Sequence, residues 1–284
     1  MFVIKRKLRI AGVAVISLLI ICFIVRYFYS NYVSSKKYEE LKEAVVETME
    51  ETTEAALMEE SEEETEPETE PELIVTPIEE ESQSMESVDD YINIDDFMNH
   101  TPSLNINHAK LLQTNEDYEG WLNIPGTNIS YPVPMAEDND FYLHKLFETK
   151  QYEYAGSLFI DAYSSKGVNQ DNLIIYGHNM KNGTMFGTLK NYKDSDYFNK
   201  HPYIEFYTAD EVRTYLVFAV RTVPASTDSL DYALEGFDTQ EYIDNAINES
   251  VNSRKVNTTG QIISLSTCVG DKTKRLLVSA IRIK

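Results

Sequence analysis

Three residues whose types support nucleophilic catalysis lie at the ends of apolar segments. Cys268 follows one such segment, Arg275 begins the next, and His178 follows a third. A cysteine is a nucleophile as its thiolate, a form that a nearby cation or a hydrogen-bonding imidazole favours. An arginine can donate two parallel hydrogen bonds to a substrate carbonyl or to a developing oxyanion. If the segments are neighbouring strands, these residues predict acyl-transfer chemistry centred on Cys268.

Other basic residues compete for two of these roles. The six residues VGDKTK, expected to form a loop between Cys268 and Arg275, contain Lys272 and Lys274. Arg275 is favoured because it begins the apolar segment and because lysine lacks the planar fork that grips one carbonyl from two nitrogens. His144 is a weaker competitor for the role of His178. The remaining histidines lie in polar surroundings typical of exposed imidazoles: His100, His108 and His201.

The N-terminal residues predict a membrane anchor. Four basic residues precede an uncharged apolar run at 10–25: Lys5, Arg6, Lys7 and Arg9. With the aromatic residues that follow Arg26, this run is close to the length of a spanning helix. No small-residue cleavage site follows it, which favours an uncleaved signal-anchor over a removed signal peptide. The positive-inside rule then places the N-terminus in the cytoplasm and the rest of the chain outside the cell.

The chain has two cysteines, and only one of them lies beyond the apolar run. Cys22 falls within the run, so Cys268 is the single thiol of the exported part and has no intrachain disulfide partner. A lone cysteine in an exported domain is a reactive thiol, a link to another chain, or an inert buried side chain. The count alone leaves these three interpretations open.

The negative charge is concentrated between the membrane run and the C-terminal region. Residues 39–90 hold 22 acidic residues against one basic residue, while the whole chain has a net charge of −22. Residues 36–60 have a composition that can form a helical stalk, but the prolines and like charges of 64–72 predict a disordered, extended spacer. We therefore expect three parts: a cytoplasmic tip and membrane anchor at 1–30, an acidic extracellular linker at 31–87, and a catalytic domain at 88–284. The acidic balance argues against a nucleic-acid partner.

The C-terminal region is predicted to form one mainly β domain with peripheral helices. Short apolar segments predict two strands within 121–135 and further strands at 157–161, 172–177, 203–208, 213–223, 262–267 and 275–283. Helical spacing occurs at 87–100, 106–120 and 239–253. Many short strands with few helices favour a closed or sandwiched β architecture.

Several stretches resemble the sortases, the cysteine transpeptidases of Gram-positive bacteria, and class B most closely. They are YGHNMKNGTMFGTLKNY around His178, LSTC ending at Cys268 with RLLV from Arg275, and WLNIPGTNISYPVPMAEDNDFYLHK from Trp121. The resemblance extends over about 91–284, and the leading helices fit class B. It implies an eight-stranded sortase-type β-barrel and no cofactor; the sequence shows no cluster with metal-ligand spacing.

The resemblance also implies roles and partners. Cys268 corresponds to the nucleophile that attacks the carbonyl after a threonine of a C-terminal sorting signal, His178 to the general acid and base, and Arg275 to the residue that holds the oxyanion. Four residues correspond to the substrate groove: Asn139, Leu143, Tyr176 and Ser266. The implied partners are secreted proteins that carry a sorting signal and an amine of peptidoglycan or its precursor, at the outer face of the cell membrane.

Three other functions remain open at this point. A membrane-anchored cysteine peptidase uses the same thiol and imidazole but lets water resolve the thioester. A pilus-polymerising sortase transfers the acyl group to another protein subunit. A non-catalytic adhesion or scaffold domain on a stalk needs no reactive thiol.

Overall fold

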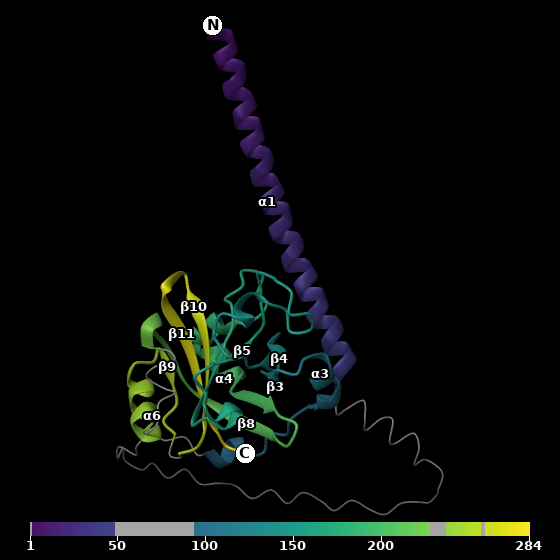
Figure 1. Ribbon diagram of the computed structural model, residues 1–284. Coiled ribbons are helices and arrows are strands. Elements are labelled where there is room, and N and C mark those ends of the chain that lie inside the picture. Colours follow the sequence, from purple (N-terminus) through teal and green to yellow (C-terminus); the bar gives the residue numbers. More distant parts are fainter. Residues whose placement is uncertain (1, 49–93, 228–236, 257–258) are drawn as a thin grey trace, which may run out of the picture.

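The computed structural model describes residues 2–48, 94–227, 237–256 and 259–284. A long helix, α1 (Phe2–Val45), rises from one end of a compact β domain, and the C-terminus lies near the other end of that domain (Figure 1). By length and composition, residues 15–45 of α1 can cross a membrane, and their apolar window is not buried against the rest of the molecule. The extended acidic spacer predicted at 64–72 lies outside the described residues.

The β domain consists of short strands with few helices. Its strands, with β1 at the end of α1, are β1 (Val46–Thr48), β2 (Leu104–Ile106), β3 (Tyr118–Asn123), β4 (Ser130–Pro134), β5 (Phe159–Ile160), β6 (Asn172–Tyr176), β7 (Tyr203–Tyr207), β8 (Val212–Pro224), β9 (Asn252–Ser253), β10 (Ile262–Val269) and β11 (Asp271–Arg282). Its α-helices are α3 (His108–Thr114), α4 (Ser195–Lys200) and α6 (Thr239–Asn248). Its 3-10 helices are η1 (Ile94–Phe97), η2 (Tyr142–His144), η3 (Gly167–Asn169), η4 (Leu189–Lys193) and η5 (Ala225–Thr227).

Eight strands form a nearly closed barrel. They follow one another in the order β4-β3-β7-β8-β11-β10-β6-β5, and β9 pairs with β8 beside this path. The two ends of the path meet where Met135, just after β4, forms a parallel bridge with Ile160 of β5. Closure removes exposed strand edges, which are otherwise sites of aggregation. The predicted eight-stranded β-barrel with peripheral helices is confirmed.

The long strand β8 is buried on both faces, which explains its nearly continuous apolar sequence. Tyr215 and Val217 belong to the barrel core, whereas Leu216 and Phe218 pack under α6 on the outer face. Successive side chains of a strand point to opposite faces, so a strand covered on both sides has apolar residues at consecutive positions.

Helix α6 is fixed to β10 and β11. The hydroxyl of Tyr242 lies 3.0 Å from Ser264 Oγ of β10 and 2.8 Å from Ser279 Oγ of β11, and these two serines are register partners. The helix ends at Asn248, earlier than the predicted limit of 253, because the chain then turns to pair β9 with β8. The contact holds β10 and β11 together from outside the barrel.

The C-terminal part of α1 is packed onto the β domain. Tyr38, Leu41 and Val45 are buried in the main core, and the Tyr38 ring meets that of Tyr131 edge to face at 5.4 Å. Beyond the helix, β1 pairs with β2. The sequence assigned residues 31–87 to the linker, within which 36–60 can form a helical stalk. In the structure, α1 continues through residues 31–45, and its buried face lies against the barrel.

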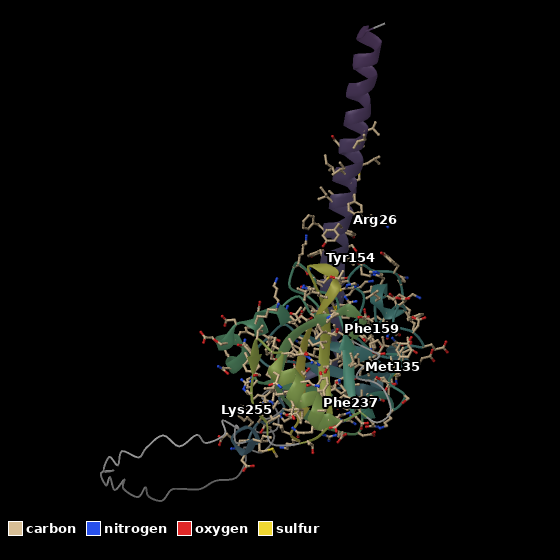
Figure 2. All side chains as sticks on the ribbon, turned by 90° about the vertical axis from the view of Figure 1, so that its left-hand side faces the viewer. Arg26, Met135, Tyr154, Phe159, Phe237 and Lys255 are labelled. Carbon is tan, nitrogen blue, oxygen red and sulfur yellow. The ribbon has the colours of Figure 1, made fainter. Side chains whose placement is uncertain are left out.

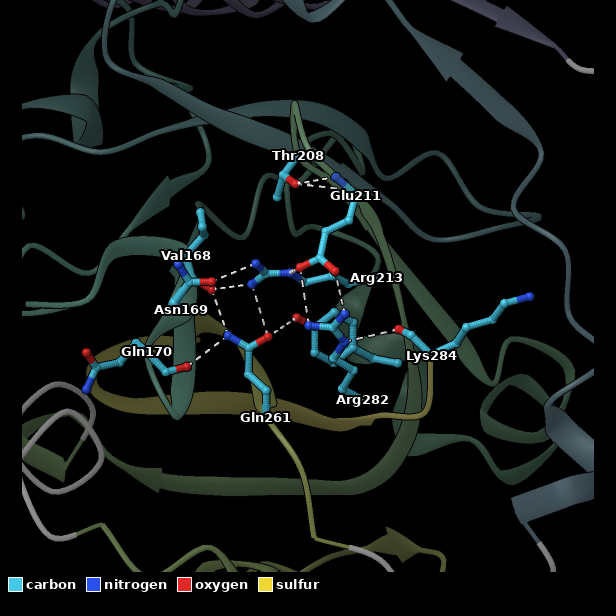
Figure 3. A network of polar contacts seen from close by, with 10 residues as sticks. Val168, Asn169, Gln170, Thr208, Glu211, Arg213, Gln261, Arg282 and Lys284 are labelled. Atoms are coloured by element: carbon cyan, nitrogen blue, oxygen red, sulfur yellow. Dashed lines mark hydrogen bonds and ion pairs between the residues drawn. The ribbon is translucent and has the colours of Figure 1, made fainter.

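A polar network joins three segments at the end of β10 opposite Cys268 (Figure 3). Arg213, which is 4 % exposed, donates hydrogen bonds to Glu211 Oε1 at 2.6 Å and to Asn169 Oδ1 at 2.7 Å. Arg282 donates to Glu211 Oε2 at 2.7 Å, and Gln261 Oε1 accepts from Arg213 at 3.2 Å. The network ties the start of β8 to the end of β11 and to η3.

Glu211 makes the stability of the protein depend on pH. Hydrogen bonds from Arg282 and Arg213 lower the pKa of Glu211 below its ordinary value of 4.5. The stabilisation is therefore complete above about pH 4.5 and is lost as the pH falls through the lower pKa of the folded state. We expect Glu211→Gln to reduce the free energy of unfolding at pH 7 by about 1 kcal/mol or less, because the carboxylate is partly exposed. Denaturation at several pH values between 7 and 3 measures the free energy of unfolding of both proteins. The difference between the variant and the wild type should decrease as the pH falls.

Asp210→Asn is the matched control for this variant. It removes a neighbouring exposed carboxylate outside the network. A difference between Glu211→Gln and the wild type that stays constant across the pH range contradicts the assignment.

Candidate active site

His178 and Cys268 lie level with each other because of the register of two parallel strands. β6 runs parallel to β10, with Tyr176 opposite Ser266 as the last pair of the ladder. His178 lies two residues beyond Tyr176, and Cys268 lies two residues beyond Ser266. Neighbouring strands are about 4.8 Å apart, so equal offsets from a paired position bring the imidazole and the thiol to the same end of the barrel.

Hydrogen bonds continue to join the segments after β6 and β10 beyond the last strand pair. Gly177 N donates to Ser266 O at 3.2 Å, and Thr267 Oγ1 donates to Gly177 O at 2.7 Å. One step further, Asn179 Nδ2 donates to Cys268 O at 2.9 Å. Both neighbours of His178, Gly177 through its backbone and Asn179 through its side chain, are therefore hydrogen-bonded to the strand that carries the thiol.

Arg275 faces Cys268 across the antiparallel pair of β10 and β11. The two residues are direct register partners. Side chains of such partners lie on the same face of a sheet, with Cβ atoms about 5 Å apart. Cys268 is partly buried and Arg275 is half-buried. The thiol therefore has the strand of His178 on one side and Arg275 on the other.

The connection between Cys268 and Arg275 is a tight hairpin, so the expected six-residue loop is wrong. β10 continues to Val269, β11 begins at Asp271, and Gly270 turns between them with a φ of 58°. The polar residues VGDKTK thus take part in the two strands and their turn. A left-handed φ at this turn favours glycine, which has no side chain to clash.

Side chains alternate between the two faces of β11, and this places Arg275 and Lys274 on opposite faces of the strand. Arg275 lines the groove beside Cys268, whereas Lys274 is exposed. Adjacent residues of a strand point to opposite faces, so the two side chains cannot both reach the groove. This placement agrees with the choice of arginine made from the sequence.

One groove of about 250 Å³ is lined by all the residues that the sequence assigned to catalysis or substrate binding. Seven of its lining residues were predicted: Asn139, Leu143, Tyr176, His178, Ser266, Cys268 and Arg275. Five others were not: Asp140, Phe159, Gly177, Ala225 and Thr267. The unpredicted residues flank predicted ones in the chain or come from β5 and η5. β5 reaches the groove by pairing with β6, and η5 follows β8, which pairs with β11.

The imidazole of His178 has a defined orientation. Its Nε2 lies 2.8 Å from the carbonyl oxygen of Leu143. A carbonyl can only accept a hydrogen bond, so Nε2 carries a proton, and in the neutral ring Nδ1 holds the lone pair. His144, the weaker competitor, stacks on this ring with centroids 5.1 Å apart. Leu143 therefore contributes its backbone to the site as well as its side chain.

A buried aspartate holds two walls of the groove. Asp161 is fully buried and accepts hydrogen bonds from Tyr176 Oη at 2.7 Å and from Asn139 Nδ2 at 3.3 Å. Asn139 Oδ1 accepts from Ala162 N at 2.8 Å. The sequence did not single out Asp161; the only signal was its place at the end of an apolar segment.

Larger hollows in the described part of the chain carry no comparable chemistry. One of about 780 Å³ lies between α1 and Tyr154, and one of about 400 Å³ lies beside Gln261. Neither is lined by cysteine or histidine. Within residues 2–48, 94–227, 237–256 and 259–284, no group of three histidine, cysteine, aspartate or glutamate side chains is arranged to hold a metal.

Comparison with known proteins agrees with this geometry. Residues 122–283 match the family model described as the sortase domain. Sortase B of Listeria monocytogenes is 35% identical over 173 residues, which cover 57% of this chain and 67% of the relative. The structure of Clostridium perfringens sortase B has a TM-score of 0.56 and 31% identity, covering 62% of this chain and 99% of the other. A Staphylococcus aureus sortase B–substrate complex has a TM-score of 0.57 and 32% identity, covering 62% and 84%.

The barrel and its relatives define a cysteine transpeptidase, an enzyme that exchanges one amide partner for another through a thiol. This chain belongs to the sortase family, and its relatives and structural neighbours assign it to class B. Enzymes of this class anchor proteins to the cell wall. The resemblance stated from the sequence is therefore confirmed.

The close packing around Gly177 gives a test of how the barrel places His178. A Cβ at Gly177 would lie 2.4 Å from Leu158 Cδ2 and 2.7 Å from Phe186 Cδ2. Both side chains are fully buried, so the overpacking in Gly177→Ala is expected to cost about 1–3 kcal/mol. We expect a lower melting temperature and, because the next residue is displaced, a loss of transpeptidation. Thermal unfolding and a peptide–amine assay measure the two effects.

Gly167→Ala is the control for a glycine substitution without a clash. Gly167 has a φ of 54°, and a Cβ at this residue would meet no atom within 4 Å. It lies in η3, away from the groove, so its substitution strains the backbone but leaves activity unchanged. Full activity in Gly177→Ala contradicts the proposed dependence of His178 on this packing.

Proposed function

We propose that this protein is a membrane-tethered sortase that cleaves a C-terminal sorting signal after threonine and joins the secreted protein to an amine of peptidoglycan or its precursor. The proposal is carried by one observation: Cys268 lies between its cross-strand partner Arg275 and the strand that leads to His178. A relative in S. aureus has been solved as a substrate complex, which supports the groove as the peptide site.

In the first half of the reaction, the thiolate of Cys268 attacks the threonine carbonyl carbon. The carbonyl electron pair moves to oxygen, and Arg275 donates hydrogen bonds to the resulting oxyanion. As the oxyanion collapses, the C–N bond breaks, and the leaving amine takes a proton from the His178 imidazolium. The product is a thioester between the secreted protein and Cys268.

In the second half, neutral His178 accepts a proton from the incoming amine. The amine nitrogen attacks the thioester carbonyl, Arg275 again holds the oxyanion, and the C–S bond breaks to return the thiolate. A new amide bond joins the secreted protein to the acceptor. The enzyme returns to its starting protonation state, so no cofactor is consumed.

The groove walls are proposed to select the peptide. Asn139, Leu143, Tyr176 and Ser266 line the groove next to the thiol. Because Asp161 already holds Asn139 and Tyr176, these two side chains form a rigid surface for the sorting signal rather than a mobile one.

We propose that α1 is a signal-anchor whose N-terminus is cytoplasmic, with the catalytic domain outside the cell. The basic residues before the apolar run support this topology. Residues 1–30 would then be the anchor, 31–87 the linker, and 88–284 the catalytic domain, against which the C-terminal part of α1 packs. Protease added to intact cells should digest the β domain; complete protection in intact cells contradicts this topology.

Substitutions at the three central residues test the proposed roles. Cys268→Ala removes the nucleophile, so we expect no transpeptidation. His178→Ala and Arg275→Ala remove a proton donor and an oxyanion donor, and each is expected to lower kcat by about a hundredfold or more. Arg275→Lys keeps the charge but loses the fork, so it should recover only part of the rate. Near-normal turnover in any alanine variant refutes the role of that residue.

The incoming nucleophile separates the proposed reaction from peptidase activity. The full-length protein in detergent is incubated with a labelled sorting peptide and increasing amounts of an amine. A transpeptidase yields an amide product that increases with amine concentration, whereas a peptidase yields only the free acid. A pilus polymerase instead forms protein–protein products when a pilin subunit is the acceptor. Lys274→Ala, which alters an exposed cation outside the groove, is the matched control for Arg275→Ala.

A further inference from the structure

A single chain segment makes three contacts with the ring of His178. Residues 142–157 fold back on themselves through Glu153 N to His144 O at 2.9 Å and Ser157 N to Tyr142 O at 3.0 Å. We call them the aromatic hairpin. From it, the Leu143 carbonyl accepts from Nε2, His144 stacks at 5.1 Å, and Tyr154 stacks at 5.9 Å with only 7° between ring planes.

The C-terminal half of α1 holds the base of the aromatic hairpin. The buried Tyr38 hydroxyl donates to Gly156 O at 2.9 Å and lies 2.9 Å from Ser157 Oγ. Ser157 Oγ in turn donates to Lys145 O at 2.8 Å, which links the two arms of the hairpin. One hydroxyl of the helix therefore fixes both arms.

A close backbone contact transmits this position to His178. Gly156 has a φ of 57°, and a Cβ there would lie 2.3 Å from the Leu143 carbonyl oxygen. That same oxygen accepts the hydrogen bond from His178. Tyr38, Gly156, the Leu143 carbonyl and the imidazole thus form one continuous series of contacts.

Residues of α1 nearer the membrane reach the exposed side of the aromatic hairpin. Tyr27 packs edge to face against Tyr154 at 5.6 Å, and Ser30 donates a hydrogen bond to Glu153. Figure 2 shows Arg26 just beyond the end of the β domain that carries Tyr154. Tyr154 is 44 % exposed, so its position depends on the rings on its two sides rather than on core packing.

We propose that α1 positions His178 through the aromatic hairpin, with Tyr154 and Tyr38 as positioning residues. The membrane helix then positions a residue of the active site in addition to anchoring the protein. The inference rests on the proposed role of His178 in proton transfer. A general acid must lie within hydrogen-bond reach of the leaving nitrogen, and small displacements of such a group cost large factors in rate. Because neither positioning residue lines the groove, they affect turnover rather than peptide affinity.

Substitutions at Tyr154 test this proposal in the full-length protein in detergent. An aromatic pair contributes about 0.5–1.5 kcal/mol, so losing the ring in Tyr154→Ala should lower kcat by up to about tenfold. KM for the sorting peptide should change less than twofold. Tyr154→Phe keeps the stacked ring and should restore the wild-type rate. Loss of activity in Tyr154→Phe equal to that in Tyr154→Ala, or unchanged kcat in Tyr154→Ala, overturns the proposal.

Tyr152→Ala is the matched control from the same hairpin. Its ring is 74 % exposed and contacts His144 but not His178, so its removal should leave kcat within about twofold. If Tyr152→Ala lowers kcat as much as Tyr154→Ala does, the effect comes from the hairpin in general, and the specific role of Tyr154 is overturned.

A double variant distinguishes this proposal from the proposed function itself. When His178 is already replaced by alanine, Tyr154→Ala should cause no further loss, because the two act as a unit. If wild-type protein gives no amine-dependent product, the proposed function fails. If His178→Ala is inactive while Tyr154→Ala is normal, only the positioning role fails.

Tyr38→Phe tests the contribution of the helix directly. The substitution keeps the ring against Tyr131 but removes the hydroxyl that fixes Gly156 and Ser157. We expect kcat to fall severalfold at unchanged KM, while alkylation of Cys268 by a small thiol reagent continues at the wild-type rate. Wild-type kcat in this variant contradicts the participation of α1.

Discussion

The register among β6, β10 and β11 is the constraint on which the site depends. A parallel ladder on one side of β10 and an antiparallel ladder on the other bring residues from distant parts of the chain to the same end of the barrel. A shift of one residue in either ladder would turn Cys268 or its neighbour away from the groove, since side chains alternate between faces. The backbone hydrogen bonds of these two ladders therefore determine which side chains face the groove.

Much of the remaining structure protects this register. Tyr242 of α6 joins the paired serines of β10 and β11 from outside, and Arg213 ties the opposite end of the barrel together. Closure between β4 and β5 leaves the sheet with little freedom to slide. At the groove end, the aromatic hairpin contacts the ring of His178, and Tyr38 of α1 holds the base of that hairpin.

The sequence predicted some elements well and others poorly, for physical reasons. Strands buried on both faces, such as β8, have apolar residues at nearly every position and were identified close to their observed limits. The stretch from Cys268 to Arg275 looked like a loop because its residues are polar, yet it pairs as a hairpin, since backbone hydrogen bonding does not require apolar side chains. A helical stalk was expected from residue 36, but its packing onto the barrel was not, because the acidic and basic residues around Tyr38, Leu41 and Val45 make the apolar face of the helix narrow.

Apolar periodicity by itself determined a closed or sandwiched β architecture, and residue type at the ends of apolar segments determined Cys268, His178 and Arg275 as candidates. Local motifs carried the resemblance to the family, and that resemblance implied the eight-stranded barrel and the residues of the substrate groove. Tertiary structure alone decided that Asp161 supports the groove and that an N-terminal helix contacts the segment over the imidazole. Asp161 meets Asn139 and Tyr176 across 22 and 15 positions, and Tyr38 meets Gly156 across 118 positions. Local sequence carries no direct signal for such contacts, since they arise only when separate elements pack together.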